Sequence, residues 1–405
     1  MKYTKDEIIQ YVAEEDVKFI RLAFCDVFGV QKNIAIMPEE LPRAFEYGIA
    51  IDASAIPGFG DVVNSDLLLH PDPDTLQELT WRPETGKVVR MYADITYPDG
   101  TPFECDTRGL LKQAIDTADA QGYSFSFGEE KEFYLFKLDD IGRRTYEPYD
   151  HAGYMDIAPE DRGENIRREI CLTLEKMGIH PERSHHEEGP GQNEIDFRYS
   201  DPLSAADNAL TFQMVVKTIA GRNGLYADFS PKPVKDAPGN GCHINVSVNP
   251  SDNFSNLNYM IAGIVDKIQE MTLFLNPTEE SYYRFGGSKA PRYISWSAEN
   301  RSQLIRIPAA QGEYCRAELR SPDNMANPYL ALTLLIHAGL HGINNKLALP
   351  DPVNANLQKA DPEVTRGLKE LPATLRDAAA LAENSGFIKR VFPQSIIDSY
   401  SKAIK

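Results

Sequence analysis

Four short segments place charged or polar residues at alternate positions, and a β-strand turns alternate side chains toward one face. The segments are residues 130–136, 194–197, 243–247 and 316–320. A face packed against a core would be apolar, whereas the alternate residues here are carboxylates, an imidazole and guanidinium groups. Four such strands in one sheet would line a cavity suited to divalent cations, bound phosphates and a carboxylate substrate.

Glu130 and Glu132 form the first of these patterns. The alternative is a strand face exposed to water, but the strand continues into the apolar run 133–136, which favours an interior position. Glu129 precedes the pair and makes three glutamates within four residues. Clustered carboxylates repel one another unless a cation lies among them, so the segment predicts a metal site.

The polar loop 184–194 leads into the second strand. Its adjacent histidines, His185 and His186, diverge from each other, and no cysteine lies near, which disfavours a zinc site. Glu187 and Glu194 are the better candidates, as oxygen ligands of a hard cation. His243 follows a turn with two glycines that let the backbone approach a ligand, although a purely structural histidine is the alternative.

Arginines gather in two neighbouring segments of this acidic chain. They are Arg301, Arg306, Arg316 and Arg320. Guanidinium groups match carboxylates and phosphates, while surface salt bridges are the alternative. The sequence has neither a GxxxxGK[ST] loop nor GxGxxG after a predicted strand, so nucleotide phosphates would be held by metals and arginines.

Helices and strands that must position these residues follow from periodicity and capping signals. We expect helices at 5–15, 38–47, 107–121, 165–177, 205–222, 259–274 and 327–349, and further strands at 17–24, 32–37, 87–95 and 124–137. A strong turn signal at 97–102 places a domain boundary near residue 103. Helices segregated around a sheet with a charged face predict an α+β fold with domains 1–103 and 104–405.

Composition limits the partners. The chain has 405 residues and a formal net charge of −18, which argues against a nucleic-acid backbone as ligand. Five widely spaced cysteines without a CxxC pair predict reduced thiols in a cytoplasmic protein. We expect no signal peptide, because the N-terminus lacks an apolar h-region. We expect no membrane association, because no apolar run reaches the roughly 20 residues that span a bilayer.

Taken together, these segments resemble the glutamine synthetase family, type I, over nearly the whole chain. The matching motifs are 128–133, 184–197, Lys232-Pro233 with 240–243, 276–278, 296–308 and 316–329. The resemblance implies a β-grasp-like N-terminal domain and a catalytic domain built on a curved antiparallel sheet. It also implies that ATP phosphorylates the γ-carboxylate of glutamate, after which ammonia displaces phosphate.

The resemblance implies two or three Mg²⁺ or Mn²⁺ ions in each site. Glu132, Glu187 and Glu194 match the ligands of one ion. Glu130, His243 and Glu318 match those of a second. Carboxylate oxygens suit such hard cations, which neutralise phosphoryl charge during transfer.

The remaining matches concern substrates. Residues matching glutamate or phosphate contacts are Arg284, Arg301, Arg320 and Gly239, of which Arg284 and Arg301 are predicted to be catalytic. Residues matching nucleotide contacts are Glu182, Ser247, Arg306 and Arg316. Asp52, also predicted to be catalytic, and Tyr154 match the ammonium pocket.

Departures from the family pattern concern the amine. The pocket motif Asp-Gly-Ser-Ser-Ile reads Asp-Ala-Ser-Ala-Ile at 52–56, so Ala55 removes one hydroxyl. Pro238 replaces an asparagine near the glutamate site. The flap 284–291 is one residue short, and Lys289 stands where a proton-accepting glutamate is expected. At 4 Å, two cations repel by about 4 kcal/mol at an effective dielectric constant of 20, so Lys289 disfavours ammonium.

Three functions follow from this pattern. The first is glutamine formation from ammonia; the second is γ-glutamylamide formation from an organic amine; the third is nucleotide binding without catalysis. The family's active sites form between subunits, so a homo-oligomeric ring is expected. The chain stops at Lys405, short of the tail that clasps a second ring, which leaves hexamer and dodecamer open.

Overall fold

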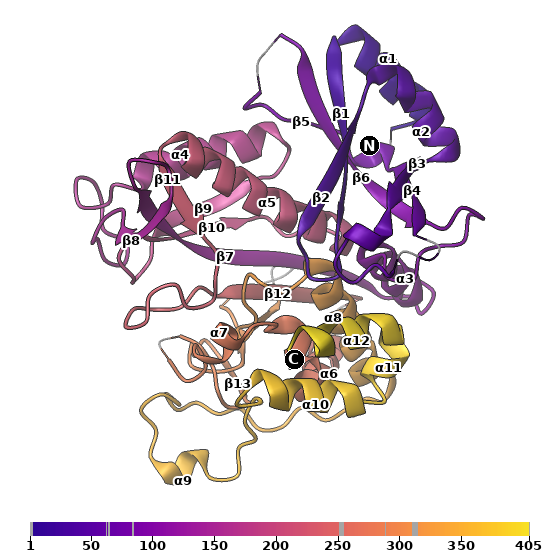
Figure 1. Cartoon of the computed structure of the whole chain (residues 1–405). Coiled ribbons are helices and arrows are strands. Elements are labelled where there is room, and N and C mark those ends of the chain that lie inside the picture. The colour runs from indigo at the N-terminus through magenta and orange to yellow at the C-terminus, as the bar shows by residue number, and fades with distance from the viewer. Residues whose placement is uncertain are drawn as a thin grey trace.

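The computed structural model describes residues 3–61, 63, 65–82, 85–250, 255–287, 289–309 and 315–404 (Figure 1). The helices are α1 (Lys5–Glu14), α2 (Leu41–Tyr47), α3 (Thr107–Asp119), α4 (Glu164–Lys176), α5 (Pro202–Arg222), α6 (Ser255–Leu275), α7 (Glu279–Tyr282), α8 (Pro328–Asn344), α9 (Pro362–Thr365), α10 (Leu375–Asn384), α11 (Ile388–Val391) and α12 (Gln394–Ala403). The strands are β1 (Val17–Cys25), β2 (Gln31–Ile36), β3 (Ile49–Asp52), β4 (Asp66–Pro71), β5 (Gln77–Glu78), β6 (Lys87–Thr96), β7 (Ser124–Leu138), β8 (Arg144–Pro148), β9 (Pro181–His186), β10 (Gln192–Phe197), β11 (Leu225–Asp228), β12 (Cys242–Asn249), β13 (Trp296–Ala298), β14 (Ile305–Ile307) and β15 (Ala317–Leu319).

The N-terminal sheet has the strand order β2-β1-β6-β4-β3, with β5 also paired to β6. β1 and β6 run parallel, and the other pairs are antiparallel. α1 and α2 lie on its outer side in Figure 1. α1 begins with a capping box in which Thr4 and Glu7 satisfy each other's backbone groups. This arrangement confirms the expected β-grasp-like domain.

The second sheet contains the strands with the predicted polar faces. Its main path is β13-β14-β15-β12-β7-β10-β9, and β11 and β8 pair with β7. The pairs are antiparallel except that β13 runs parallel to β14, so the sheet is mixed rather than purely antiparallel. All four strands with polar alternate positions lie in this sheet, as the sequence predicted.

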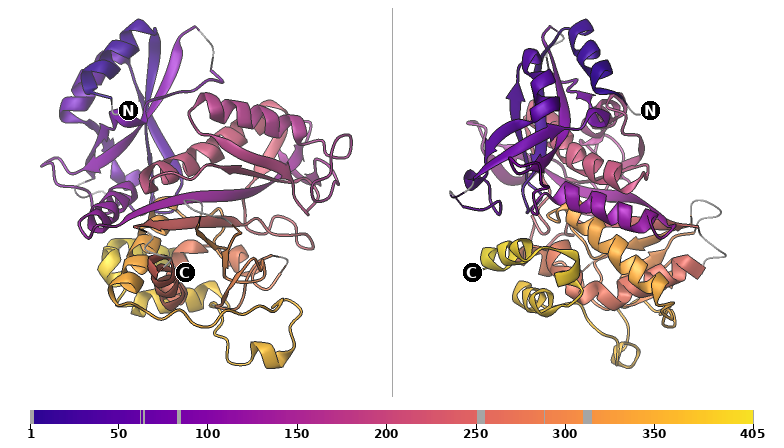
Figure 2. Two further views of the ribbon diagram at one scale, coloured as in Figure 1. Left: turned by 180° about the vertical axis from the view of Figure 1, so that it is seen from behind. Right: turned by 90° about the vertical axis from the view of Figure 1, so that its right-hand side faces the viewer.

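Helices cover both sides of this sheet. α4 and α5 lie between it and the N-terminal sheet, whereas α6, α8, α10 and α12 lie on the opposite side (Figures 1 and 2). α6 and α8 approach so closely that a Cβ on Gly263 would lie 2.1 Å from the carbonyl oxygen of Ala338. Two glycines, Gly263 and Gly342, face each other at this crossing.

The predicted elements are confirmed with shifts of a few residues at most ends. The exception is α8, which ends at Asn344 rather than at the predicted residue 349. Asn327 caps its N-terminus by accepting from the backbone N–H groups of Tyr329 and Leu330, as its Asn-Pro start indicates. No helix in the described ranges is long and apolar enough to cross a membrane.

One apolar core joins the two sheets. It includes Ile20 of β1, Leu111 of α3, Met260 of α6 and Leu335 of α8. The C-terminal helix α12 closes this core against the N-terminal domain, because the hydroxyl of Tyr400 donates to the carbonyl of Val27 over 3.0 Å. The sheet that contains the charged strands therefore packs against an apolar core that is continuous with the core of the N-terminal domain.

Candidate active site

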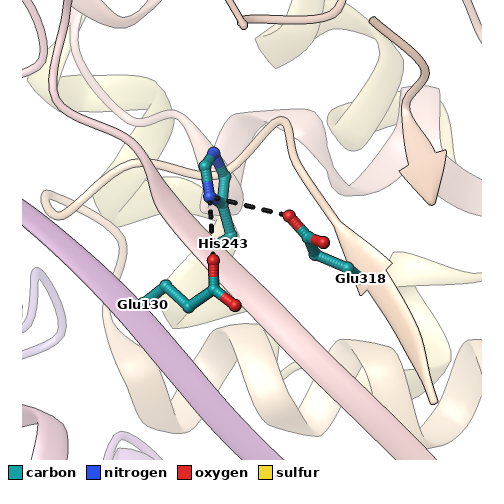
Figure 3. Close-up of side chains that lie close together, drawn as sticks. All are labelled: Glu130, His243 and Glu318. Carbon is teal, nitrogen blue, oxygen red and sulfur yellow. Dashed lines mark hydrogen bonds and ion pairs between the residues drawn. The ribbon is translucent and has the colours of Figure 1, made fainter. Parts of the chain in front are cut away.

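Glu130, His243 and Glu318 meet from three adjacent strands (Figure 3). Cross-strand register places His243 opposite Glu130, and Glu318 opposite Asn245 on the far side of β12. The Nδ1 atom of His243 lies 3.4 Å from Glu130 Oε2 and 3.7 Å from Glu318 Oε1. All three side chains are buried, so the strands form a compact set of two carboxylates and an imidazole.

Cations and hydrogen-bond donors surround both carboxylates. Arg306 and Arg320 both pair with Glu318, which has no exposed side-chain surface. Burial disfavours the charge of Glu130, but hydrogen bonds from His243 and Asn245 keep its pKa below the usual range. The Nδ2 group of Asn245 donates to Glu130 Oε1 over 3.0 Å.

A second acidic cluster lies beyond β7. Ligand atoms of His185, Glu187 and Glu194 lie within 4.8 Å of one another. His186 fixes the adjacent backbone, because its Nδ1 group lies 2.6 Å from the Glu187 carbonyl oxygen and its Nε2 group 2.8 Å from Asp150 Oδ1. The imidazole of His185 thus joins a cluster that the sequence predicted from its carboxylates alone.

Glu132 lines the same cavity but faces a different set of donors. Its Oε2 atom accepts from the backbone N–H of Gly241 over 2.8 Å and from the Nε2 group of Gln192 over 3.2 Å. Among the described residues, Glu132 belongs to none of the groups whose ligand atoms all lie within 4.8 Å of one another. Of the predicted first-ion ligands, Glu187 and Glu194 are brought together, while Glu132 lies at the edge.

A third acidic group links the two clusters. Ligand atoms of Glu130, Glu194 and Asp196 lie within 4.8 Å of one another, and Arg183 pairs with Asp196. Burial and the nearby carboxylates raise the pKa of Glu194 well above its usual range. Burial and Glu130 raise the pKa of Asp196 to about 6.

These acidic groups have the chemistry that a divalent cation requires. Carboxylate oxygens are the usual ligands of Mg²⁺, and Mn²⁺ accepts imidazole as well. The raised pKa of Glu194 shows that its charge lacks sufficient compensation from the protein alone. A cation among these groups would supply the compensation, so the residues present fit the ions that the resemblance implies.

Lys289 reaches into this cavity from the flap. Its Nζ atom lies 3.2 Å from Glu187 Oε2, 3.1 Å from Glu188 Oε1 and 4.5 Å from the ring centroid of Tyr154. Burial opposes its charge, but Glu187 and Glu188 raise the pKa of the Lys289 ammonium above the usual value. A cation therefore stands at the pocket where the resemblance implies that ammonium binds.

The predicted glutamate contacts lie next to the His243 cluster. A Cβ on Gly239 would lie 2.7 Å from Arg284 Cγ, so the backbone passes close to this side chain. Arg284 donates through Nη1 to the carbonyl of Ser321 over 3.1 Å. Its buried Nε group has no hydrogen-bond partner among the described residues and is a donor that a substrate carboxylate would satisfy.

Two small cavities share Glu130 and Arg183. The larger, of about 60 Å³, is lined by Glu130, Glu132, Tyr154, Met155, Arg183, His185, Glu187, Glu194, His243, Lys289, Arg301, Arg306 and Arg320. The smaller, of about 50 Å³, includes Glu182 and Arg316, which match nucleotide contacts. Small-molecule pockets usually measure about 300–1,000 Å³, so both cavities are small for a ligand of that size.

Five predicted site residues are absent from both cavity linings, namely Asp52, Gly239, Ser247, Arg284 and Glu318. Ser247 is on β12 two residues beyond Asn245 and is absent from either lining. Asp52 ends β3 in the N-terminal sheet, where its exposed carboxylate accepts from the backbone and hydroxyl of Ser54. Ala55 is likewise exposed in this segment. One chain therefore does not bring the Asp52 segment to the acidic clusters.

Glu129 does not belong to the acidic cluster that the sequence predicted for it. Strand alternation turns it to the opposite face of β7, where Glu129 Oε2 lies 2.6 Å from Lys131 Nζ. Lys131 Nζ also lies 3.4 Å from the sulfur of Cys242. This buried ion pair supports the strand from behind while Glu130 and Glu132 face the cavity.

Four polar residues of the site received no individual role from the sequence: Asp196 and Asn245 belonged to the predicted polar strand faces, His185 was weighed only as a zinc ligand, and Arg183 was not singled out. Asp196 follows Glu194 by two positions and Asn245 follows His243 by two, so strand alternation was a usable signal for both. Arg183 and His185 also alternate along β9. Their pairing with β10 depends on register, which short polar strands do not specify.

Comparison with known families assigns both parts of the chain. Residues 16–98 match the glutamine synthetase β-grasp domain, and residues 104–405 match the glutamine synthetase catalytic domain. A glutamine synthetase of Methanosarcina mazei is 45% identical over 98% of this chain and 92% of that protein. A glutamine synthetase of Staphylococcus aureus strain MW2 is 42% identical over 100% and 94%.

Solved structures with the same fold include a complex of GmaS with ADP. It has a TM-score of 0.88 and 27% sequence identity, covering 98% of this chain and 94% of that one. The glutamine synthetase of Plasmodium falciparum has a TM-score of 0.86 and 22% identity, covering 100% and 96%. The second likeness concerns the fold alone.

Proposed function

The chain belongs to the glutamine synthetase family, and from this premise we propose that it forms glutamine from glutamate, ammonia and ATP through γ-glutamyl phosphate. The family assignment identifies it as a ligase of the glutamate–ammonia type, which sets aside the non-catalytic alternative. The observation that carries the proposal is the convergence of Glu130, His243 and Glu318 beside buried arginines.

Two cation positions would serve phosphoryl transfer. Glu130, His243 and Glu318 would hold one Mg²⁺ or Mn²⁺ ion, and Glu187 and Glu194 a second, with His185 or Glu132 completing it. When bound, such cations neutralise the charge on the transferred phosphoryl group. A third ion would find donors at Asp196, between the two positions.

Arginines would bind and orient the substrates. The unpaired Nε group of Arg284, next to Gly239, would receive a carboxylate of glutamate. Arg301 and Arg320 line the acidic cavity, where they would stabilise negative charge on the transferred phosphate. Glu182, Ser247, Arg306 and Arg316 would contact the nucleotide, a proposal supported by the likeness to the GmaS–ADP complex.

A second candidate is γ-glutamylamide formation from an organic amine. The specific observation in its favour is the Lys289 ammonium, which lies over the ring of Tyr154. A lysine there competes with ammonium, and Ala55 supplies no hydroxyl to the pocket segment. A larger amine would gain apolar contacts that ammonium lacks.

Phosphate release from ATP, with Mg²⁺ and glutamate, tests both candidates across ammonium, alkylamines, polyamines and amino acids. We expect the fastest release with ammonium and glutamine as the product by mass spectrometry. A preference for one organic amine would replace the first candidate with the second. Absence of amine-dependent release with every member of the panel would contradict both.

We also propose an oligomeric assembly, a domain division and a cellular location for the enzyme. Asp52 lies outside the cavity of its own chain, which supports a ring, hexameric or dodecameric, in which a neighbour supplies it. The turn between β6 and α3 supports a division into domains 1–103 and 104–405. The free thiols among the described residues and the net charge of −18 support a cytoplasmic enzyme without a nucleic-acid partner.

A further inference from the structure

Lys289 lies at the place where a metal ion would bind Glu187. The Oε2 atom of Glu187 is 3.2 Å from Lys289 Nζ, and Glu187 belongs to the close group that it forms with His185 and Glu194. A second carboxylate, Glu188, lies 3.1 Å from the same ammonium group. An ammonium ion and a divalent cation both seek these oxygens, and they repel each other when close.

Lys289 is a cation of this cavity that can move toward water. Arg320 is fully buried on the sheet and pairs with the equally buried Glu318. The Lys289 side chain, by contrast, is 28% exposed and belongs to a loop between α7 and β13. Moving the lysine toward water disrupts one loop side chain, whereas moving Arg320 would leave a charge unpaired in the core.

The flap also contacts the other cation position through its backbone. The carbonyl oxygen of Lys289 accepts from Arg320 Nη2 over 3.3 Å, and Arg320 Nη1 pairs with Glu318. Glu318 is one of the three residues around the His243 cluster. The backbone of Lys289 therefore contacts one acidic cluster while its side chain contacts the other.

We propose that Lys289 is a built-in counter-cation, which occupies the Glu187 position in the metal-free enzyme and must leave before a divalent ion binds there. The inference rests on the metal role proposed above for Glu187. Lys289 weakens this one position and makes its occupancy depend on the flap. The lysine thereby stabilises the acidic cluster in the absence of metal and delays completion of the site until its ammonium group has left Glu187.

Manganese binding to the whole enzyme, without ATP or glutamate, tests this inference. The electron paramagnetic resonance signal of free Mn²⁺ would be followed during titration of His243→Ala, in which the other position is disabled. In this His243→Ala background, Lys289→Gln should lower the dissociation constant of Mn²⁺ at the Glu187 position at least about tenfold, because a competing unit charge is removed. Lys289→Arg, which keeps the charge, should bind Mn²⁺ as weakly as the parent.

Lys267→Gln is the matched control, because Lys267 also lies between two carboxylates, Asp266 and Glu270, but outside the site. It should leave the Mn²⁺ isotherm unchanged. Equal tightening by Lys267→Gln would show an effect of overall charge and overturn the proposal, as would an unchanged isotherm for Lys289→Gln. Because the titration contains no substrate, its result is independent of whether the enzyme makes glutamine.

Discussion

Glu318 shows how single residues determine the electrostatics of this site. The carboxylate is completely buried, and three cationic or potentially cationic side chains surround it: His243, Arg306 and Arg320. Two of these are arginines, which keep their charge at any ordinary pH. Removal of His243 therefore leaves both arginine ion pairs of Glu318 in place.

Replacing His243 by alanine should remove one donor from the cluster with Glu130 and Glu318. We expect phosphate release from ATP to fall at least about 100-fold, since metal affinity is lost at a ligand position. The thermal midpoint should change little, because both arginines still pair with Glu318. Phosphate release and differential scanning fluorimetry measure the two effects.

His341→Ala provides the control for this prediction. His341 Nε2 lies 3.3 Å from Asp266 Oδ2 on the surface, away from both cavities. Its removal should leave phosphate release within about twofold of the parent, as expected for an exposed pair. Retention of full activity by His243→Ala would contradict the proposed metal role.

At the scale of single elements, the two faces of β7 differ: one faces the acidic cavity and the other faces an apolar cluster. One face presents Glu130 and Glu132 to the cavity. The other carries Phe133 and Leu135 in an apolar cluster, together with the buried Glu129–Lys131 pair. A paired buried charge is tolerated, whereas a single one is strongly unfavourable.

Lys131→Met should therefore destabilise the enzyme by about 3–5 kcal/mol, because Glu129 would remain buried without a counter-ion. Changing both residues to methionine should recover most of that loss, since an apolar pair of similar volume replaces the ion pair. Urea denaturation followed by circular dichroism measures both variants. A double variant as unstable as the single one would show that the pair is not the source of the effect.

The crossing of α6 and α8 is a second element-scale constraint. Gly263→Ala would place a methyl group 2.1 Å from the Ala338 carbonyl oxygen and 2.7 Å from the Gly342 nitrogen. The helices must separate, and we expect a loss of about 1–3 kcal/mol or more in unfolding free energy. Urea denaturation is again the measurement.

Gly221→Ala is the control for Gly263→Ala, because it adds the same methyl group to a helix at a position with open space around it. Gly221 lies near the end of α5, and nothing lies within 4 Å of the Cβ that alanine would add. Alanine should stabilise there by about 0.5–1 kcal/mol, through helix propensity. Equal effects of the two substitutions would contradict the close-packing argument for Gly263.

At the scale of the whole molecule, one chain brings together most of the predicted site but not its Asp52 segment. The acidic clusters lie on the large sheet, whereas Asp52 is exposed at the end of β3 in the N-terminal domain. The two sheets share one apolar core, which fixes their relative position. We therefore expect a neighbouring copy to supply the Asp52 segment, as proposed above.

Mixing two inactive variants tests that arrangement. Asp52→Ala and His243→Ala should each be inactive alone, yet co-assembled rings should recover about one quarter of parental activity. In a ring with random mixing, one site in four would combine an intact Asp52 from one copy with an intact His243 from its neighbour. Phosphate release after co-expression gives the answer, and no recovery would place both residues in the same chain.

The sequence by itself determined the strands, their polar faces and the family. Alternation is a local property, so Glu130 and Glu132 on one strand, and His243 on another, were predictable without coordinates. Helix caps such as Asn327 were equally local. The motifs then indicated the catalytic domain and the six candidate metal ligands.

Only the tertiary structure decided which of these side chains meet. It put Glu129 behind the sheet with Lys131, added His185 to the Glu187 cluster, and placed Lys289 on Glu187. The contact between Lys289 and Glu187 joins residues 102 positions apart. Such meetings depend on strand register and on the path of a loop, which arise from packing of the whole chain rather than from the pattern of any one segment.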